Sequence, residues 1–123
     1  MNEITVNFIV NDNEIELAGG QRVTMSGKIM QFVDFGEAIV LLIDWMVTNR
    51  NVFGINHEGR QLWQIAEQPA VHNDNPCTHL ERRGAHAFVG TWDGLELLVE
   101  PLTGQIIKER RERGITTEWI DPS

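Results

Sequence analysis

Residues 38–65 have the sequence AIVLLIDWMVTNRNVFGINHEGRQLWQI, and this stretch decides the fold class. Residues 38–43 are apolar at every position, which is typical of a central strand buried on both faces of a sheet. Residues 52–56 and 61–65 flank a short polar segment in which Gly59 can adopt the positive φ of a tight turn. The stretch therefore predicts a core strand followed by a β-hairpin.

Alternating apolar and polar residues continue outward from this stretch in both directions, whereas helical periodicity is nearly absent. Further strands are expected at residues 4–10, 14–18, 23–33, 85–91, 95–100 and 105–111. Residues 66–84 contain prolines and no apolar alternation, so they predict a long loop. For the tail at 114–123, a last short strand and a frayed end remain as alternatives.

The fold class that follows is all-β. We predict a single domain over residues 1–123, built of seven to nine antiparallel strands in meander order and folded as a sandwich or a partly open barrel. A chain of 123 residues with 41% hydrophobic and 23% charged residues has the size and composition of one ordinary domain. It is long enough to bury a core without a disulfide or a structural metal.

The sequence carries no feature of a membrane or secreted protein. Its longest apolar run is far shorter than the ~20 residues of a membrane-spanning helix. The first residues, MNEITVNFIV, lack a basic leader and a cleavage site. The single cysteine, Cys77, cannot form an internal disulfide, which fits a reducing compartment. We therefore expect a cytoplasmic protein that does not bind membranes.

The charge balance argues against nucleic-acid binding. The chain has 18 acidic and 10 basic residues, and its net charge of -8 repels a phosphate backbone. The basic residues gather at Arg82 and Arg83 and again within residues 108–113, where glutamates interleave with them. The second group favours a solvated edge strand protected by charge. Arg82 and Arg83 remain candidate residues for binding a partner.

Tryptophan occurs four times and tyrosine not at all. Trp63 and Trp92 follow the strand pattern, so we expect them in the core or at a corner of the fold. Trp45 and Trp119 lie in less regular segments and are the better candidates for an exposed contact surface. Together with the two arginines named above, they form the predicted set of binding residues.

The expected loop contains the best candidate cluster for metal binding or nucleophilic chemistry. His72, Cys77 and His79 bring two imidazoles and a thiol together, and such ligands suit zinc. His57 or His86 would have to complete a four-ligand site, because neither a CxxC pair nor an HExxH motif occurs. Cys77 and His79 also form a candidate nucleophile and base. The favoured interpretation is a solvated polar loop, so we predict no catalytic residue and no metal ligand.

The two hairpin sequences VFGINHEGRQLWQI and LLVEPLTGQIIKER align with Gly59 and Gly104 in register, about 45 residues apart, a spacing found in propeller-blade repeats. On these residues the chain resembles the quinoprotein-type propeller repeat, in which an apolar strand ends in a small acidic turn and a second strand closes with tryptophan. Residues 100–106 match the turn, and residues 56–63 match the tryptophan half. The resemblance implies blade-like strand–turn–strand units.

The resemblance to quinoproteins brings no cofactor with it. A propeller closes with at least about four blades, and a chain of 123 residues supplies fewer. Catalytic quinoproteins also surround their cofactor with residues from several blades, so we expect no quinone and no other cofactor here. The chain also looks like small uncharacterised bacterial all-β proteins that carry the same NVFGIN…G…LWQI and WDG…TG pieces, a resemblance that implies no function.

Three function hypotheses follow from these observations. The first is a small cytoplasmic binding or interaction module without catalytic activity, which has a protein partner or forms a homo-oligomer. The second is a small metal-binding protein or hydrolase that uses residues 72–79. The third, which rests on the acidic charge alone, is an immunity or accessory protein that neutralises a basic enzyme.

Overall fold

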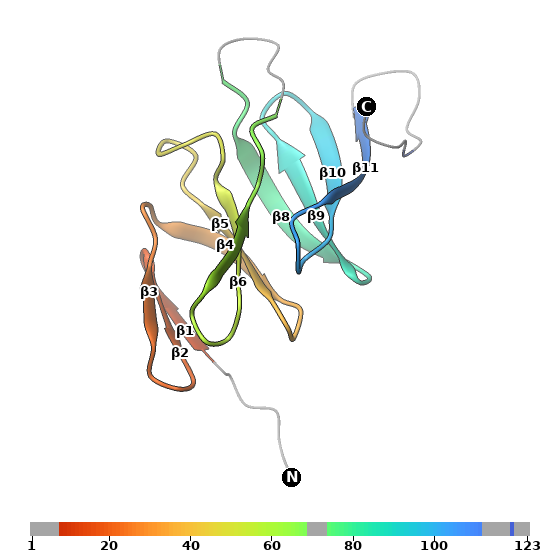
Figure 1. Cartoon of the computed structure of the whole chain (residues 1–123). Coiled ribbons are helices and arrows are strands. Elements are labelled where there is room, and N and C mark those ends of the chain that lie inside the picture. The colour runs from red at the N-terminus through yellow and green to blue at the C-terminus, as the bar shows by residue number, and fades with distance from the viewer. Residues whose placement is uncertain (1–7, 69–73, 112–118, 120–123) are drawn as a thin grey trace.

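The structure, a computed structural model, describes residues 8–68, 74–111 and 119. Within these ranges the chain forms eleven strands and no helix, so the all-β prediction is confirmed, with more strands than the seven to nine expected. No helix in the described part is long and apolar enough to cross a membrane. The strands form three antiparallel sheets in a sandwich-like arrangement, not a closed barrel (Figure 1).

Each sheet is a meander of strands that are consecutive in the sequence. The first sheet contains β1 (Phe8–Asn11), β2 (Glu14–Leu17) and β3 (Arg22–Thr24). The middle sheet contains β4 (Ile29–Asp34), β5 (Ile39–Ile43), β6 (Val52–Ile55) and β7 (Gln61–Gln64). The third sheet contains β8 (Cys77–Arg83), β9 (His86–Thr91), β10 (Leu95–Val99) and β11 (Ile106–Arg111).

The central strand of the middle sheet, β5, is buried on both faces. All five residues of β5 are at most 1% exposed. Ile39, Leu41 and Ile43 join the hydrophobic cluster shared with the first sheet, here called the first cluster. Val40 and Leu42 join the cluster shared with the third sheet, here called the second cluster. The central strand expected at residues 38–43 is therefore confirmed, and Figure 1 shows a sheet on either side of it.

Trp63 on β7 joins the middle sheet to the third sheet. Its indole Nε1 donates a hydrogen bond of 2.7 Å to the carbonyl of Pro101, in the turn between β10 and β11. The ring lies against two glycines, Gly54 on the neighbouring strand β6 and Gly104 in that turn. A Cβ atom at Gly104 would stand 2.6 Å from the indole, so the close packing of the ring depends on the missing side chain. Trp63 is a core residue, as predicted.

Two polar side chains hold the backbone of β8 against the middle sheet. The side chain of Asn51 donates to the Cys77 carbonyl at 2.7 Å and accepts from the Cys77 amide at 2.9 Å. Oε1 of Gln31 accepts a hydrogen bond of 2.7 Å from the amide of Leu80. Because β8 is the edge strand of its sheet, these bonds satisfy backbone groups that a neighbouring strand would otherwise satisfy.

The long loop predicted for residues 66–84 is wrong in its second half, where β8 occupies Cys77–Arg83. The register of β8 on β9 shifts between Cys77 and His79, which is a β-bulge. The bulge turns both Cys77 and Leu80 into the core although they are three residues apart. It therefore hides the period of two by which a strand is recognised. The alternatives for the tail at 114–123 fall outside the described residues, apart from Trp119.

Candidate binding site

An open groove of about 650 Å³ lies where three connections of the chain meet. These are the loop between β5 and β6, residues 74–76 before β8, and the turn between β9 and β10. We call it the aromatic groove, and it is lined by Trp45, Met46, Val47, Thr48, Asn49, Asp74, Pro76 and Trp92.

Hydrogen bonds within the loop between β5 and β6 fix the first wall of the groove. Oδ1 of Asp44 accepts from the Met46 amide at 2.9 Å, and the Asp44 carbonyl accepts from the Val47 amide at 3.2 Å. Oγ1 of Thr48 accepts from the amide of Arg50 at 3.1 Å. Such short-range side-chain bonds to the backbone are typical of turns, and they hold Trp45 and its neighbours in one conformation.

The second part of the lining is the turn that carries Trp92. The amide of Trp92 donates to the Pro76 carbonyl at 2.9 Å, and the amide of Asp93 donates to Oδ1 of Asn75 at 3.1 Å. Asn75 and Pro76 are buried. The turn is therefore bonded to the segment that leads into β8, and both sides of the groove rest on the framework of the sheets.

The groove exposes large apolar side chains. Trp45 is 43% exposed, Trp92 is 72% exposed and Met46 is 83% exposed. Clustered exposed aromatic and methionine side chains are typical of binding surfaces. The exposed position predicted for Trp45 is confirmed. Of the two positions expected for Trp92, the core and a corner of the fold, the structure shows the corner, because the strand ends at Thr91 and Trp92 projects from a turn whose Gly94 has a φ of 92°.

The polar lining of the groove is rich in hydrogen-bond acceptors. Nδ2 of Asn49 lies 3.3 Å from Oδ1 of Asp74 and 3.4 Å from Oε2 of Glu67. Ionised carboxylates only accept hydrogen bonds, so the Asn49 amide must present its NH2 group to them. The remaining polar atoms of this pair are the Asn49 side-chain carbonyl oxygen and the Asp74 carboxylate, both acceptors.

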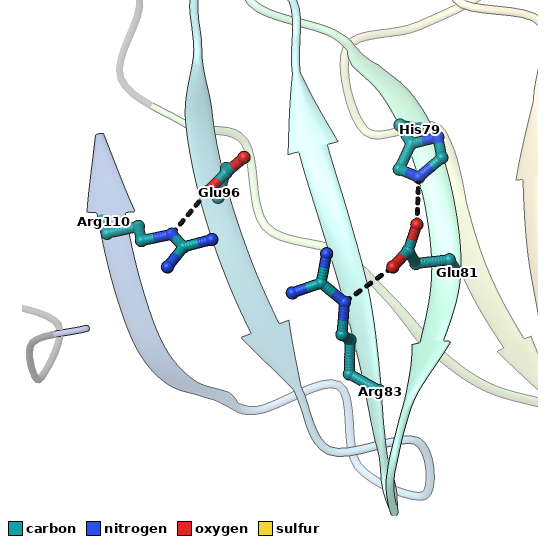
Figure 2. Close-up of polar contacts among 5 residues, drawn as sticks. All are labelled: His79, Glu81, Arg83, Glu96 and Arg110. Atoms are coloured by element: carbon teal, nitrogen blue, oxygen red, sulfur yellow. Dashed lines mark hydrogen bonds and ion pairs between the residues drawn. The ribbon is translucent and has the colours of Figure 1, made fainter. Parts of the chain in front are cut away.

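The outer face of the third sheet carries a second polar cluster, shown in Figure 2. On β8, Glu81 accepts from Nε2 of His79 at 2.7 Å and from Nε of Arg83 at 2.6 Å. These two hydrogen bonds, that of His79 first, hold the pKa of Glu81 below its ordinary value. Glu96 on β10 pairs with Arg110 on β11 at 2.5 Å. The cluster is a set of ion pairs across neighbouring residues and strands.

Arginines of the third sheet also lie over aromatic rings. The Arg83 guanidinium is 4.0 Å from the centre of the Phe88 ring. The Arg110 guanidinium is 4.1 Å from the centre of the Trp119 ring, and Trp119 meets Phe88 edge to face. Such cation–π contacts stabilise the side chains that cover the outer face of the third sheet. Trp119, expected on an exposed surface, is thus half-buried between an arginine and a phenylalanine.

The four predicted binding residues do not form one site. Trp45 lines the aromatic groove, while Arg83 and Trp119 belong to the outer cover of the third sheet. Arg82 turns to the middle sheet, where its guanidinium lies 4.9 Å from the Phe35 ring and donates to the Asp34 carbonyl at 3.3 Å. The residue that shares the groove with Trp45 is Trp92, and the Asp-Gly that follows it was the sequence signal of an exposed turn.

The thiol and imidazole of residues 77–79 lie apart. Cys77 is 1% exposed in the second cluster, and burial raises its pKa to about 12. The bulge reverses the side-chain direction between Cys77 and His79. His79 is therefore exposed on the outer face, where it bonds to Glu81. His72 lies outside the described residues. Within the described ranges, no group of three or more histidine, cysteine, aspartate or glutamate side chains is placed to hold a metal ion.

Comparison with known proteins assigns the chain to a family. Residues 5–111 match the family model described as Domain of unknown function (DUF7957). No curated protein matches the chain. The family match includes all eleven strands and every described residue of the aromatic groove. The chain therefore belongs to the DUF7957 family.

Proposed function

We propose that this domain is a small cytoplasmic binding module without catalytic activity, and that the aromatic groove is its binding face. The observation that carries the proposal is the pair of exposed tryptophans, Trp45 and Trp92, that line one groove. Tryptophan offers a large, rigid contact area and is enriched among the residues that dominate binding energy. Backbone hydrogen bonds hold both segments that carry these tryptophans, which reduces the loss of backbone entropy on binding.

The chemistry of the lining supports binding over catalysis. Among the described lining residues, Asp74 has the one ionisable side chain. General acid–base catalysis uses a positioned group with a shifted pKa near the reacting atoms, whereas aromatic faces with a few oriented acceptors are sufficient for recognition. The side chains that line the groove are therefore sufficient for a binding module.

We further propose that the hairpins β6–β7 and β10–β11 are two copies of a blade-like unit related to the quinoprotein-type repeat. Each hairpin ends a four-stranded antiparallel meander. Gly59 and Gly104, the aligned turn glycines, both have positive φ. Trp63 of the first unit packs on Gly104 of the second, which supports a repeated unit that docks on its neighbour.

An affinity-capture experiment with matched variants tests the binding module. The full chain, immobilised as bait, is expected to recover a partner in stoichiometric amount, and Trp45→Ala and Trp92→Ala to lose it. Leu102→Ala is the control, because Leu102 is 43% exposed in the turn at the opposite end of β10. A partner recovered equally by the wild type and both tryptophan variants would overturn the proposed face. Recovery of a second copy of the chain would make the partner a homo-oligomer.

A further inference from the structure

The charged side chain in the described lining of the aromatic groove is acidic. Asp74 lines the groove, and Glu67 is bonded to the same Asn49 amide as Asp74. Arg50, in the same loop as Trp45, does not line the groove and donates to the carbonyls of Ile65 at 2.9 Å and Gln64 at 3.5 Å. The whole chain has a net charge of -8. These acidic side chains and the acidic net charge favour a cationic ligand.

The aromatic walls suit the same class of ligand. The face of an indole carries partial negative charge and attracts a guanidinium or ammonium group within about 6 Å of the ring centre. The stem of an arginine or lysine is apolar, so it can pack on Val47 and Pro76 while its charged end reaches Asp74. A planar guanidinium both stacks on an indole and forms paired hydrogen bonds with a carboxylate, which favours arginine over lysine.

The chain forms this combination of arginine, aromatic ring and carboxylate twice on the third sheet, with arginines of its own. Arg83 lies over Phe88 and bonds to Glu81, and Arg110 lies over Trp119 and bonds to Glu96. Each arginine thus has an aromatic face and a carboxylate. The groove offers the same two partners, and none of its described lining residues is an arginine or a lysine.

We infer that the aromatic groove binds an arginine side chain of a partner protein, and that its lining residues Trp45, Trp92 and Asp74 supply the contacts. This inference rests on the proposed function, since it names the ligand of the same groove. Its occupant is a peptide segment with an exposed arginine, and the acceptor-rich lining selects that segment by charge and by hydrogen-bond donors.

Titration followed by nuclear magnetic resonance tests the inference on the full chain labelled with ¹⁵N. The probes are the blocked tripeptides Gly-Arg-Gly, Gly-citrulline-Gly and Gly-Glu-Gly. Citrulline keeps the shape of arginine and removes its charge. We expect the arginine peptide to shift the indole N–H signals of Trp45 and Trp92 and to leave that of the buried Trp63 in place. Its dissociation constant should be about tenfold lower than that of the citrulline peptide.

Substitutions separate the site from the general charge of the protein. Asp74→Asn should weaken binding of the arginine peptide by about three- to tenfold and leave binding of the citrulline peptide unchanged. Glu37→Gln removes the same charge from the exposed turn between β4 and β5 and should change the affinity less than about twofold. Trp92→Ala should abolish the shift of Trp45, and Trp92→Phe, which keeps an aromatic face, should retain part of the affinity.

Each contrary result has a distinct meaning. If the citrulline or glutamate peptide shifts Trp45 and Trp92 with the same affinity as the arginine peptide, the inferred cation is wrong and the groove still binds. If Asp74→Asn and Glu37→Gln weaken the binding of the arginine peptide equally, the overall charge of the protein attracts the peptide, and the inference is wrong. If no peptide moves the two signals, the arginine ligand is wrong, and the capture experiment alone decides whether the groove is a binding face.

Discussion

Asn51 shows how much a single buried polar residue contributes to this fold. It is 0% exposed, and its amide joins three backbone groups, the carbonyls of Ile43 and Cys77 and the amide of Cys77. A buried backbone group that loses its partner costs about 1 to 3 kcal/mol. We therefore expect Asn51→Ala to lower the free energy of unfolding by roughly 2 to 5 kcal/mol, measured from urea denaturation curves.

The control for this prediction is Asn11→Ala. Asn11 is exposed at the end of β1, so its replacement should change the free energy of unfolding by less than about 0.5 kcal/mol. Equal midpoints for Asn51→Ala and the wild type would mean that water replaces the three hydrogen bonds of the amide without loss.

Cys77 allows a prediction about reactivity and pH. Burial raises the pKa of its thiol from 9.0 to about 12, so the folded protein keeps the thiol protonated at pH 8. Because the thiolate is the nucleophile, dithionitrobenzoate should label the native protein at least about a hundredfold more slowly than the urea-unfolded chain. Equal labelling rates would show that the thiol is accessible in the native protein.

The same shift has a definite sign for stability. A group whose pKa is higher in the folded state stabilises the fold most below its unfolded pKa. For Cys77 this contribution is complete below about pH 9 and falls as the pH rises toward 12, since only the unfolded chain ionises there. A Cys77→Ser variant, which removes the ionisable thiol, should lack this part of the alkaline loss of stability.

The candidate site was half predictable from the sequence. Trp45 could be assigned to an exposed surface because it stands in a segment without period. The Asp-Gly after Trp92 indicates a turn, but the sequence does not show that this turn is hydrogen-bonded to residues 75 and 76, beside the loop of Trp45. Contacts between segments distant in the sequence carry no local signal, and for that reason the groove itself could not be predicted.

At the scale of elements, the junction between β7 and the β10–β11 turn can be tested with glycines. Gly104 has a φ of 77°, and a Cβ there would stand 2.6 Å from the indole of Trp63. Gly36 has a φ of 95°, and a Cβ there would meet nothing within 4 Å. Gly36→Ala should lose about 1 to 2 kcal/mol for the backbone conformation alone. Gly104→Ala should lose about 1 to 3 kcal/mol more because of overpacking.

Thermal unfolding followed by tryptophan fluorescence measures both glycine variants. Gly104→Ala should also change the emission of the native state, because the indole must move from the carbonyl of Pro101. Equal losses of stability in the two variants would contradict a tight contact between Trp63 and the turn.

The strands themselves were predicted well where turn chemistry and period agree. The hairpins at 52–65 and 95–111 have a positive-φ glycine between alternating segments, and both occur in the structure. The run at 23–33 was expected to be one strand, but it divides into β3 and β4, which belong to different sheets. Its break is set by contacts with the β1–β2 turn, where Ile29 donates to the carbonyl of Asp12. Tertiary hydrogen bonds of this kind leave no period in the sequence.

At the scale of the whole molecule, the middle sheet links two hydrophobic clusters, and this arrangement predicts cooperative unfolding. Ile15 is 0% exposed in the first cluster, and Trp63 lies in the second. Ile15→Ala should cost about 2 to 5 kcal/mol. If the sheets unfold as one domain, denaturation followed by tryptophan fluorescence and by far-ultraviolet circular dichroism should shift together. A circular dichroism transition that separates from an unchanged fluorescence transition would mean that the first sheet unfolds independently.

One face of the middle sheet is covered by an earlier part of the chain and the other by a later part, and this order matters during synthesis. The first sheet precedes the middle sheet in the sequence, so one face of β5 can be covered as soon as β5 leaves the ribosome. The other face, with Val40 and Leu42, must wait for β8 to β11. At about 5 to 20 residues per second, that wait lasts a few seconds. In that interval the nascent chain presents an apolar sheet face to chaperones and to neighbouring nascent chains.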